Sequence, residues 1–298
     1  DIDMPTAITQ IAGRKVAAEK IPSWWEIEKI WYPKHLSLEQ CSSEITARYK
    51  ARLLQGDSLT DLTGGFGIDC SFLATGFKSA TYVERQEELC EIAAHNFPVL
   101  NLNHINIKNE DGVTYLQAMS PVDCLFLDPA RRNEHGGKTV AISDCEPNVA
   151  ELEELLLQKA NRVMIKLSPM LDLSLALKEL KQTQEVHILS VNNECKELLI
   201  LLGQTSPAEI SIHCVNLFTK GTQKEQHFVF TREQEQCSEC TYTDSLETYL
   251  YEPNASLLKA GAFRSIAAAY PVRKLHPNSH LYTSDLSLIH ISEPTRLR

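Results

Sequence analysis

The residues best suited to chemistry lie in the stretch Asp61-Leu62-Thr63-Gly64-Gly65-Phe66-Gly67. The apolar residues before it predict a buried strand, and the glycines predict a turn that leads into a helix. A carboxylate therefore stands at the strand end, beside the turn. The pyrophosphate of a dinucleotide prefers bare backbone N–H groups at a helix N-terminus and no neighbouring anion. An acid at this place instead favours a ligand that carries an ammonium and a sulfonium.

The same turn departs from the dinucleotide-binding fingerprint. Cys70 follows the glycines where that fingerprint has a third glycine for close packing of the helix on the strand. We therefore predict a site for S-adenosyl-L-methionine (AdoMet), in which Asp61 holds the methionine amine. A turn that binds no ligand is the alternative, because a glycine turn alone is a weak motif. The turn residues assigned to the site are Thr63, Gly64, Gly65 and Gly67.

Two further acids follow predicted strands. A second candidate strand ends in Glu84, near the offset of about 20 residues expected of a ribose-binding carboxylate. A short third strand over 105–107 leads into a turn that contains Glu110 and Asp111, and we assign Asp111 to the adenine amino group. Acids at the ends of three successive parallel strands would line the sheet edge at which doubly wound folds bind ligands.

The second chemical motif is an apolar run over 122–127 that ends in Asp128 and Pro129. Such a run is typical of a central parallel strand, and proline stops the strand and stiffens the backbone. We predict that Asp128 positions the acceptor or takes its proton, with Pro129 beside it in the catalytic motif. Amino-group methyltransferases have Asp/Asn-Pro-Pro-aromatic here, whereas this chain has Ala130 and Arg131. The stacking ring is missing, although an arginine plane can stack on a base or pair with a phosphate.

Three basic residues around this motif are candidate substrate-binding groups. Lys166 ends a predicted fifth strand over 162–167 and would contact a phosphate or a base. Alternatively, Lys166 extends its ammonium to solvent from a strand end and binds no substrate. Arg131 and Arg132 are, in the same way, alternatively a solvated pair after a strand. The three candidates are Arg131, Arg132 and Lys166.

Several longer segments carry a resemblance to a known family. The chain is similar to bacterial class I AdoMet-dependent methyltransferases that have a ferredoxin-like segment and a THUMP-like domain at the C-terminus. Because THUMP domains are associated with RNA-modifying enzymes, the resemblance implies methyl transfer from AdoMet to a base of ribosomal or transfer RNA. Methylation of a protein or small molecule, and a non-catalytic AdoMet- or RNA-binding module, are the alternatives. The segments include 61–67, 127–132, 166–172 and 193–199.

The alternation of strand and helix patterns predicts an α/β fold. We expect a Rossmann-like class I methyltransferase with a doubly wound, seven-stranded, mostly parallel sheet. Residues 209–218 and 226–230 should pair as an edge hairpin. The predicted parts are an N-terminal helical region over 1–50, a methyltransferase domain over 51–232, and a truncated, small α+β segment, ferredoxin-like or THUMP-like, over 233–285.

The last residues stand apart from these patterns. Residues 286–298 resemble a translated sequencing adapter, and we exclude them from the fold as a non-native tail. The chain also begins without methionine, at Asp1. We therefore expect a fragment at both ends, with most of the THUMP-like domain absent.

Composition sets the broad limits of function. The 298 residues are 43% hydrophobic, enough for a sizeable core in one or two domains, and the net charge of −10 argues against general nucleic-acid binding. An RNA substrate would need a local basic patch. Nine cysteines in a chain without a secretory signal or a long apolar span predict a reduced, cytoplasmic protein with no membrane partner. We expect no metal, because Cys237 and Cys240 have ligand spacing but no second pair nearby.

Overall fold

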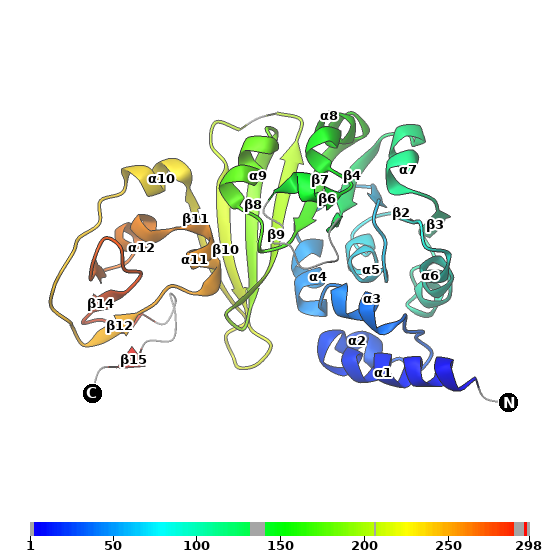
Figure 1. Ribbon diagram of the computed structural model, residues 1–298, viewed down its shortest axis with the longest axis horizontal. Helices are drawn as coiled ribbons and strands as arrows, with labels where there is room; N and C mark the ends of the chain where they lie inside the picture. The colour runs from blue at the N-terminus through cyan, green and yellow to red at the C-terminus, as the bar shows by residue number, and fades with distance from the viewer. Residues whose placement is uncertain (1–2, 132–140, 206, 289–294, 297–298) are drawn as a thin grey trace. The chain divides into compact units, whose positions relative to one another are not determined.

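The computed structural model describes residues 3–131, 141–205, 207–288 and 295–296 (Figure 1). The chain divides into two compact units. The first comprises Asp1–Lys166 with Leu202–Gln204, and the second Leu167–Leu201 with Thr205–Arg298. Within the described residues, every helix is too short or too polar to cross a membrane.

The first unit begins with four helices that pack around the glycine turn. They are α1 (Met4–Lys20), α2 (Pro22–Trp25), α3 (His35–Gln40) and α4 (Glu44–Ala51), drawn in blue in Figure 1. Their apolar side chains form one buried cluster with Phe66 of the turn. Trp24 meets Phe66 edge-on, with the ring centroids 5.2 Å apart. The N-terminal helices therefore hold the turn in place by apolar packing.

The strands of the first unit form a parallel array in the order β3-β2-β1-β4-β7. Because parallel strands point the same way, their carboxyl ends meet at one edge, and the predicted acids of β1, β2 and β4 end there. The strands are β1 (Ser58–Asp61), β2 (Ser79–Glu84), β3 (Ile105–Asn109), β4 (Val122–Leu127) and β7 (Ala160–Leu167). The connecting helices are α5 (Ile68–Ala74), α6 (Glu87–Val99), α7 (Gly112–Ala118) and α8 (Val149–Lys159).

A small antiparallel pair follows β4. It consists of β5 (Ala130–Arg131) and β6 (Cys145–Glu146), with the short 3-10 helix η1 (Ile142–Asp144) before β6. Ile142 of η1 and Cys145 of β6 are both buried. The chain that leaves the Asp-Pro motif therefore returns toward that motif before α8 begins.

The second unit adds four strands in the order β9-β8-β10-β11. β10 pairs parallel with β8 and antiparallel with β11, so the predicted hairpin is confirmed. The strands are β8 (Thr183–Val191), β9 (Glu194–Gly203), β10 (Ser211–Leu217) and β11 (Glu225–Thr231), preceded by α9 (Leu173–Glu179).

The mostly parallel α/β architecture is confirmed, but its strand count is not. The array in the first unit has five described strands and that in the second has four, nine in all, where the sequence predicted seven. The sequence missed β9, whose apolar run from Leu198 to Leu202 is fully buried. Such a run has no alternation that separates a strand from a buried helix. Asn192 and Asn193, with φ of 49° and 63°, make the tight two-residue turn that joins β8 to β9.

The chain ends in a small α+β part, as predicted. Its strands hydrogen-bond in the order β13-β14-β12-β15 around the buried rings of Tyr251 and Tyr282. The Tyr282 hydroxyl donates to the carbonyl of Phe263 at 2.7 Å. The elements are α10 (Arg232–Cys237), β12 (Tyr249–Tyr251), α11 (Ala255–Ala260), α12 (Phe263–Ala269), β13 (Arg273–Lys274), β14 (Tyr282–Ser284) and β15 (Thr295–Arg296).

Candidate functional site

Asp61, the last residue of β1, is a buried acid beside the glycine turn. It is 1% exposed, and its Oδ1 accepts a hydrogen bond from the Thr63 backbone N–H at 2.9 Å. Burial raises the pKa of Asp61 to about 8, and the nearby carboxyls of Asp69, Asp128 and Glu84 add to that rise. Among the described residues, no lysine or arginine forms an ion pair with it. A ligand that brings a positive charge would stabilise the ionised form of this acid.

The glycines of the turn are required by close packing and backbone geometry. Gly64 donates its N–H to Val83 at 2.8 Å, and a Cβ on Gly64 would lie 2.3 Å from the Tyr82 ring. Gly67 has a φ of 88° and caps the start of α5. Both constraints hold whether or not a ligand binds, so the glycines alone do not identify the ligand.

Glu84 ties the end of β2 to the same turn. One carboxylate oxygen accepts the Gly65 N–H at 2.9 Å, and the other accepts the Gln86 N–H at 2.8 Å. Glu84 is 8% exposed. Because a carboxylate has about four acceptor positions, two backbone bonds leave capacity for the paired hydroxyls of a ribose.

Asp111, which the sequence assigns to the adenine, caps α7. Its Oδ1 accepts hydrogen bonds from the backbone N–H groups of Val113 and Thr114, both at 3.0 Å. The loop that carries it lies close to the end of β1, since a Cβ on Gly112 would be 2.2 Å from the Leu62 carbonyl oxygen. The cap uses one oxygen of this exposed carboxylate.

Asp128 is joined to Asp61 through Thr63. The Asp128 N–H donates to the Thr63 hydroxyl at 2.6 Å, and that hydroxyl lies 3.4 Å from the Asp61 Oδ1. The Asp128 side chain is 38% exposed and pairs with the ammonium of Lys166 at 2.6 Å. Partial burial raises the pKa of Asp128, although Lys166 opposes the rise. Pro129 follows it as a buried residue.

Lys166 belongs to a buried charge network. Its ammonium lies 3.0 Å from the Ser42 hydroxyl and 3.4 Å from an oxygen of Asp69. The fully buried Lys50 completes the network, with its ammonium 2.7 Å from the other Asp69 oxygen. Burial alone would raise the pKa of Asp69, but the two lysines lower it to about 2. Two lysines thus balance Asp69 and Asp128, and neither of them forms an ion pair with Asp61 in the part of the chain that the structure describes.

The sequence did not identify three members of this network. Ser42 lies in the loop between α3 and α4, Lys50 on α4 and Asp69 on α5, and a lysine or acid on a helix is usually a solvated charge. A signal did exist for Lys50, because it shares a helical face with Thr46 and Ala47, which are both buried.

The predicted substrate-binding residues have different placements. Lys166 is 8% exposed and contacts Asp128, so it would act on a substrate through that acid. The backbone of Arg131 pairs with Cys145, whereas the Arg131 side chain and all of Arg132 lie outside the described residues.

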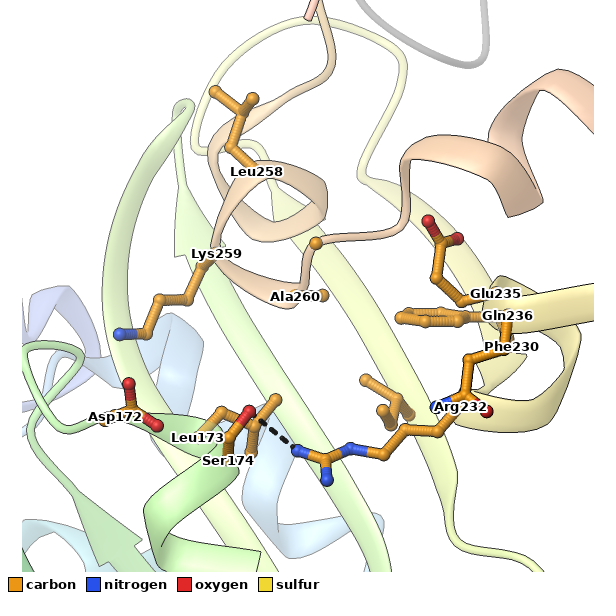
Figure 2. A pocket seen from close by; sticks show the side chains of 12 residues that line it. Asp172, Leu173, Ser174, Phe230, Arg232, Glu235, Gln236, Leu258, Lys259 and Ala260 are labelled. Atoms are coloured by element: carbon orange, nitrogen blue, oxygen red, sulfur yellow. Dashed lines mark hydrogen bonds between the residues drawn. The ribbon is translucent and has the colours of Figure 1, made fainter. Parts of the chain in front are cut away.

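A cavity of about 450 Å³ lies in the second unit and contains none of the predicted site residues (Figure 2). Arg232 reaches across it to the Ser174 hydroxyl at 3.0 Å. Lys259 donates to the Leu171 carbonyl at 2.7 Å. With Asp172 and Glu235 also on its wall, the cavity has no single sign of charge that would select a ligand.

Comparison with known proteins places the chain in a family. It superposes on the crystal structure of a putative methyltransferase from Porphyromonas gingivalis W83 with a TM-score of 0.87 and 36% identity, over 98% of this chain and 75% of that one. The chain belongs to the family of that methyltransferase. A family described as a ferredoxin-like domain also matches residues 249–290, which confirms the predicted ferredoxin-like segment. A search of curated proteins finds no match.

More distant structures add little to this family assignment. A modification subunit of a putative type I restriction enzyme from Vibrio vulnificus YJ016 gives a TM-score of 0.45 and 11% identity, over 67% of this chain and 56% of that one. A putative methyltransferase from Streptococcus mutans, solved with SAH, gives a TM-score of 0.38 and 12% identity, over 54% and 96%. Likeness at this level carries no argument about the site of this family member.

Proposed function

We propose that this protein binds AdoMet at the edge formed by β1, β2 and β3, and transfers its methyl group to a base of ribosomal or transfer RNA. The observation that carries the proposal is the buried carboxyl of Asp61. Burial and neighbouring acids raise its pKa to about 8, and two lysines nearby are already paired with other acids. A cationic ligand would supply the missing counter-charge.

Three acids would hold the donor. Asp61 would accept hydrogen bonds from the methionine ammonium, and Glu84 would accept the ribose hydroxyls with the capacity left by its two backbone bonds. Asp111 would accept the adenine amino group with the oxygen that does not cap α7. When bound, AdoMet supplies an electrophilic methyl group on a sulfonium.

Asp128 would position the acceptor. Its carboxylate, held at 2.6 Å by Lys166, would accept the N–H of an attacking amino group and orient the nitrogen lone pair toward the methyl carbon. As the nitrogen–carbon bond forms, the sulfur keeps the electron pair of the breaking bond, and the nitrogen becomes positive. Asp128 or water would then take the proton of that nitrogen. The buried Pro129 would fix the backbone at this point.

RNA is the proposed acceptor because of the resemblance to RNA-modifying methyltransferases. The net charge of −10 requires that phosphate contacts be local, and Arg131 and Arg132 follow the Asp-Pro motif directly. Two alternatives share this donor site but leave RNA unmodified. In one, the acceptor is a protein or a small molecule, and in the other the protein is a non-catalytic binding module.

Transfer of a labelled methyl group tests the proposal. The protein is incubated with methyl-labelled AdoMet and with separate RNA, protein and small-molecule fractions from a strain that lacks the gene. We expect label in RNA, and one methyl mark missing from that strain by mass spectrometry. Asp128→Asn should abolish transfer while AdoMet affinity stays within about threefold, since the donor is held by other acids.

Asp57→Asn is the matched control, because Asp57 forms an exposed ion pair with Lys78 and should not alter transfer. If the labelled methyl group appears only in the protein or small-molecule fraction, the proposal that RNA is the acceptor is rejected. Unchanged transfer by Asp128→Asn would remove Asp128 from the mechanism.

A further inference from the structure

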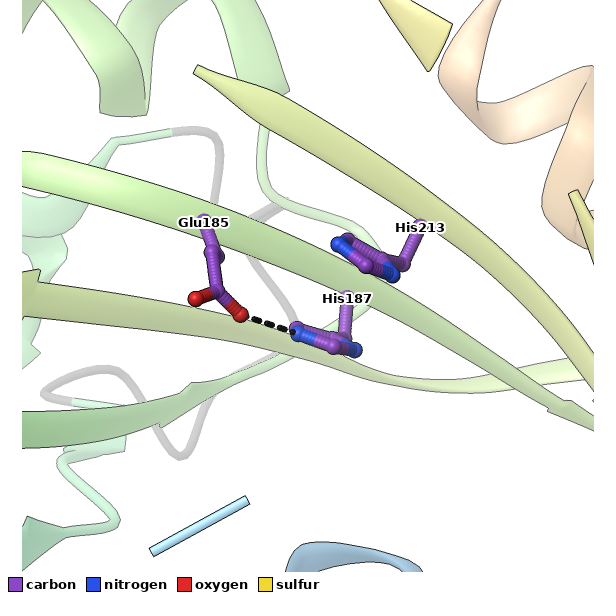
Figure 3. Close-up of side chains that lie close together, drawn as sticks. All are labelled: Glu185, His187 and His213. Atoms are coloured by element: carbon purple, nitrogen blue, oxygen red, sulfur yellow. Dashed lines mark hydrogen bonds and ion pairs between the residues drawn. The ribbon is translucent and has the colours of Figure 1, made fainter. Parts of the chain in front are cut away.

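A row of histidines crosses one face of the second unit's strands. His187 of β8 lies directly opposite His213 of β10 in the parallel pairing, and Glu185 lies opposite Ser211. Because side chains alternate between faces with a period of two, Glu185, His187 and His213 all project from the same face (Figure 3). No residue of the proposed AdoMet site belongs to this row.

We propose that Glu185, His187 and His213 bind a divalent transition-metal ion such as Zn²⁺. One ligand atom from each residue can be chosen so that all three lie within 4.8 Å of one another. The His187 Nε2 is already 3.1 Å from a Glu185 oxygen, and the two imidazoles stack with centroids 4.2 Å apart and planes 14° apart. Figure 3 shows the carboxylate turned toward the edge of the His187 ring.

These separations suit a tetrahedral ion. Zinc bonds of about 2.0–2.2 Å at a tetrahedral angle put ligand atoms about 3.4 Å apart. The Glu185–His187 contact is already at that spacing, and the widest pair in the trio must close by about 1.4 Å or less. The two imidazoles must also turn out of their stacked arrangement when an ion binds, because an imidazole nitrogen binds a metal in the plane of its own ring. Two histidines with one glutamate form a known three-ligand zinc set that leaves a position for water.

The neighbouring side chains support His213 as a ligand. Its Nε2 lies 3.2 Å from the hydroxyl of Ser211, which is the residue opposite Glu185 in the pairing.

The other nitrogen of His213 has an outer partner. His213 Nδ1 lies 3.0 Å from His227 Nε2, and His227 Nδ1 lies 3.6 Å from Glu225. Second partners of this kind orient metal-binding imidazoles and fix their tautomer. The row thus contains both the ligands and the groups that would hold one of them in position.

The proposal departs from the sequence prediction of no metal. That prediction considered Cys237 and Cys240, which lack a second pair. The histidine site was not visible in the sequence, because its members come from two strands that are neighbours only in the folded sheet.

Zinc titration of the full, chelator-treated chain tests the site. We expect one Zn²⁺ per chain in competition with a chromophoric chelator, and a rise in melting temperature when zinc is added. Glu185→Gln and His213→Gln should each weaken binding at least tenfold, while circular dichroism shows that both variants fold. His276→Gln is the matched control, because His276 is an exposed histidine of the same unit outside the row.

A cobalt titration gives a second readout. Co²⁺ should give visible absorption bands in the wild type and in His276→Gln, and the bands should vanish in His213→Gln. The proposal fails if the wild type binds no zinc, or if the Glu185 and His213 variants bind it as the wild type does. It also fails if binding disappears in a Cys237→Ser/Cys240→Ser variant but persists in His213→Gln.

Discussion

The raised pKa of Asp61 predicts that donor binding releases a proton. In the ligand-free protein, a pKa of about 8 keeps the carboxyl largely protonated at neutral pH. Binding of a ligand ammonium would favour the carboxylate, so the proton must leave. At pH 7 the protein should therefore release about 0.9 proton per ligand bound. From pH 6 to pH 7 the affinity should rise nearly tenfold, which is about 1.3 kcal/mol.

Isothermal titration of the wild type with S-adenosylhomocysteine measures this directly. The ligand carries the ammonium without the reactive sulfonium, and its amine stays protonated between pH 6 and 7. The observed heat should change with the ionisation enthalpy of the buffer, and the slope gives the number of protons. Asp61→Asn should lose most of the affinity, and any residual binding should release no proton at this residue.

The same carboxyl has an opposite effect on stability. Because the folded pKa of Asp61 is raised, the folded state holds a proton that the unfolded state has lost between about pH 4 and pH 8. The free energy of unfolding should therefore fall by about 1.4 kcal/mol for each unit by which the pH rises through that window. Asp61→Asn should remove this pH dependence. Buffer-independent heats at pH 7, or an unchanged slope in Asp61→Asn, would refute the reasoning.

Three further predictions concern the residues around Asp61. Lys50→Met leaves Asp69 with one lysine and should lower the free energy of unfolding in urea by about 3–5 kcal/mol. Lys78→Met, in an exposed ion pair, should change that free energy far less. Gly67→Ala should destabilise the protein more than Gly221→Ala in thermal melts. Both glycines have left-handed φ, but only a Cβ on Gly67 would meet a ring, at 3.0 Å, while nothing lies within 4 Å at Gly221. Asp69, with a pKa lowered to about 2, should contribute stability above pH 4 that is lost as the pH falls to 2, by about 2 kcal/mol. Acid unfolding of Asp69→Asn should lack this component, and an identical acid curve would contradict the assignment.

The placement of three acids at one edge of the parallel strands could be predicted from local sequence. Asp61, Glu84 and Asp128 each end a short apolar run, and parallel strands bring such ends together without any further information. The glycine turn could also be predicted, because the positive φ angles at Gly65 and Gly67 exclude most other residues.

The charge network could not be predicted in the same way. Lys50, Asp69 and Lys166 are far apart in the chain, and their contacts follow from how α4 packs on α5. The local sequence gives only a weak indication that Lys50 is buried, because Lys50 shares a helical face with Thr46 and Ala47. The strand β9 was missed for a related reason. Its continuous apolar run indicates burial but lacks the alternation of apolar and polar residues that would identify a strand.

A crystal structure of the protein with S-adenosylhomocysteine tests the central claim most directly. We expect the ligand amine within hydrogen-bonding distance of Asp61, the ribose hydroxyls at Glu84 and the adenine amino group at Asp111. A ligand bound away from these three acids, or no binding at millimolar concentration, would contradict the account.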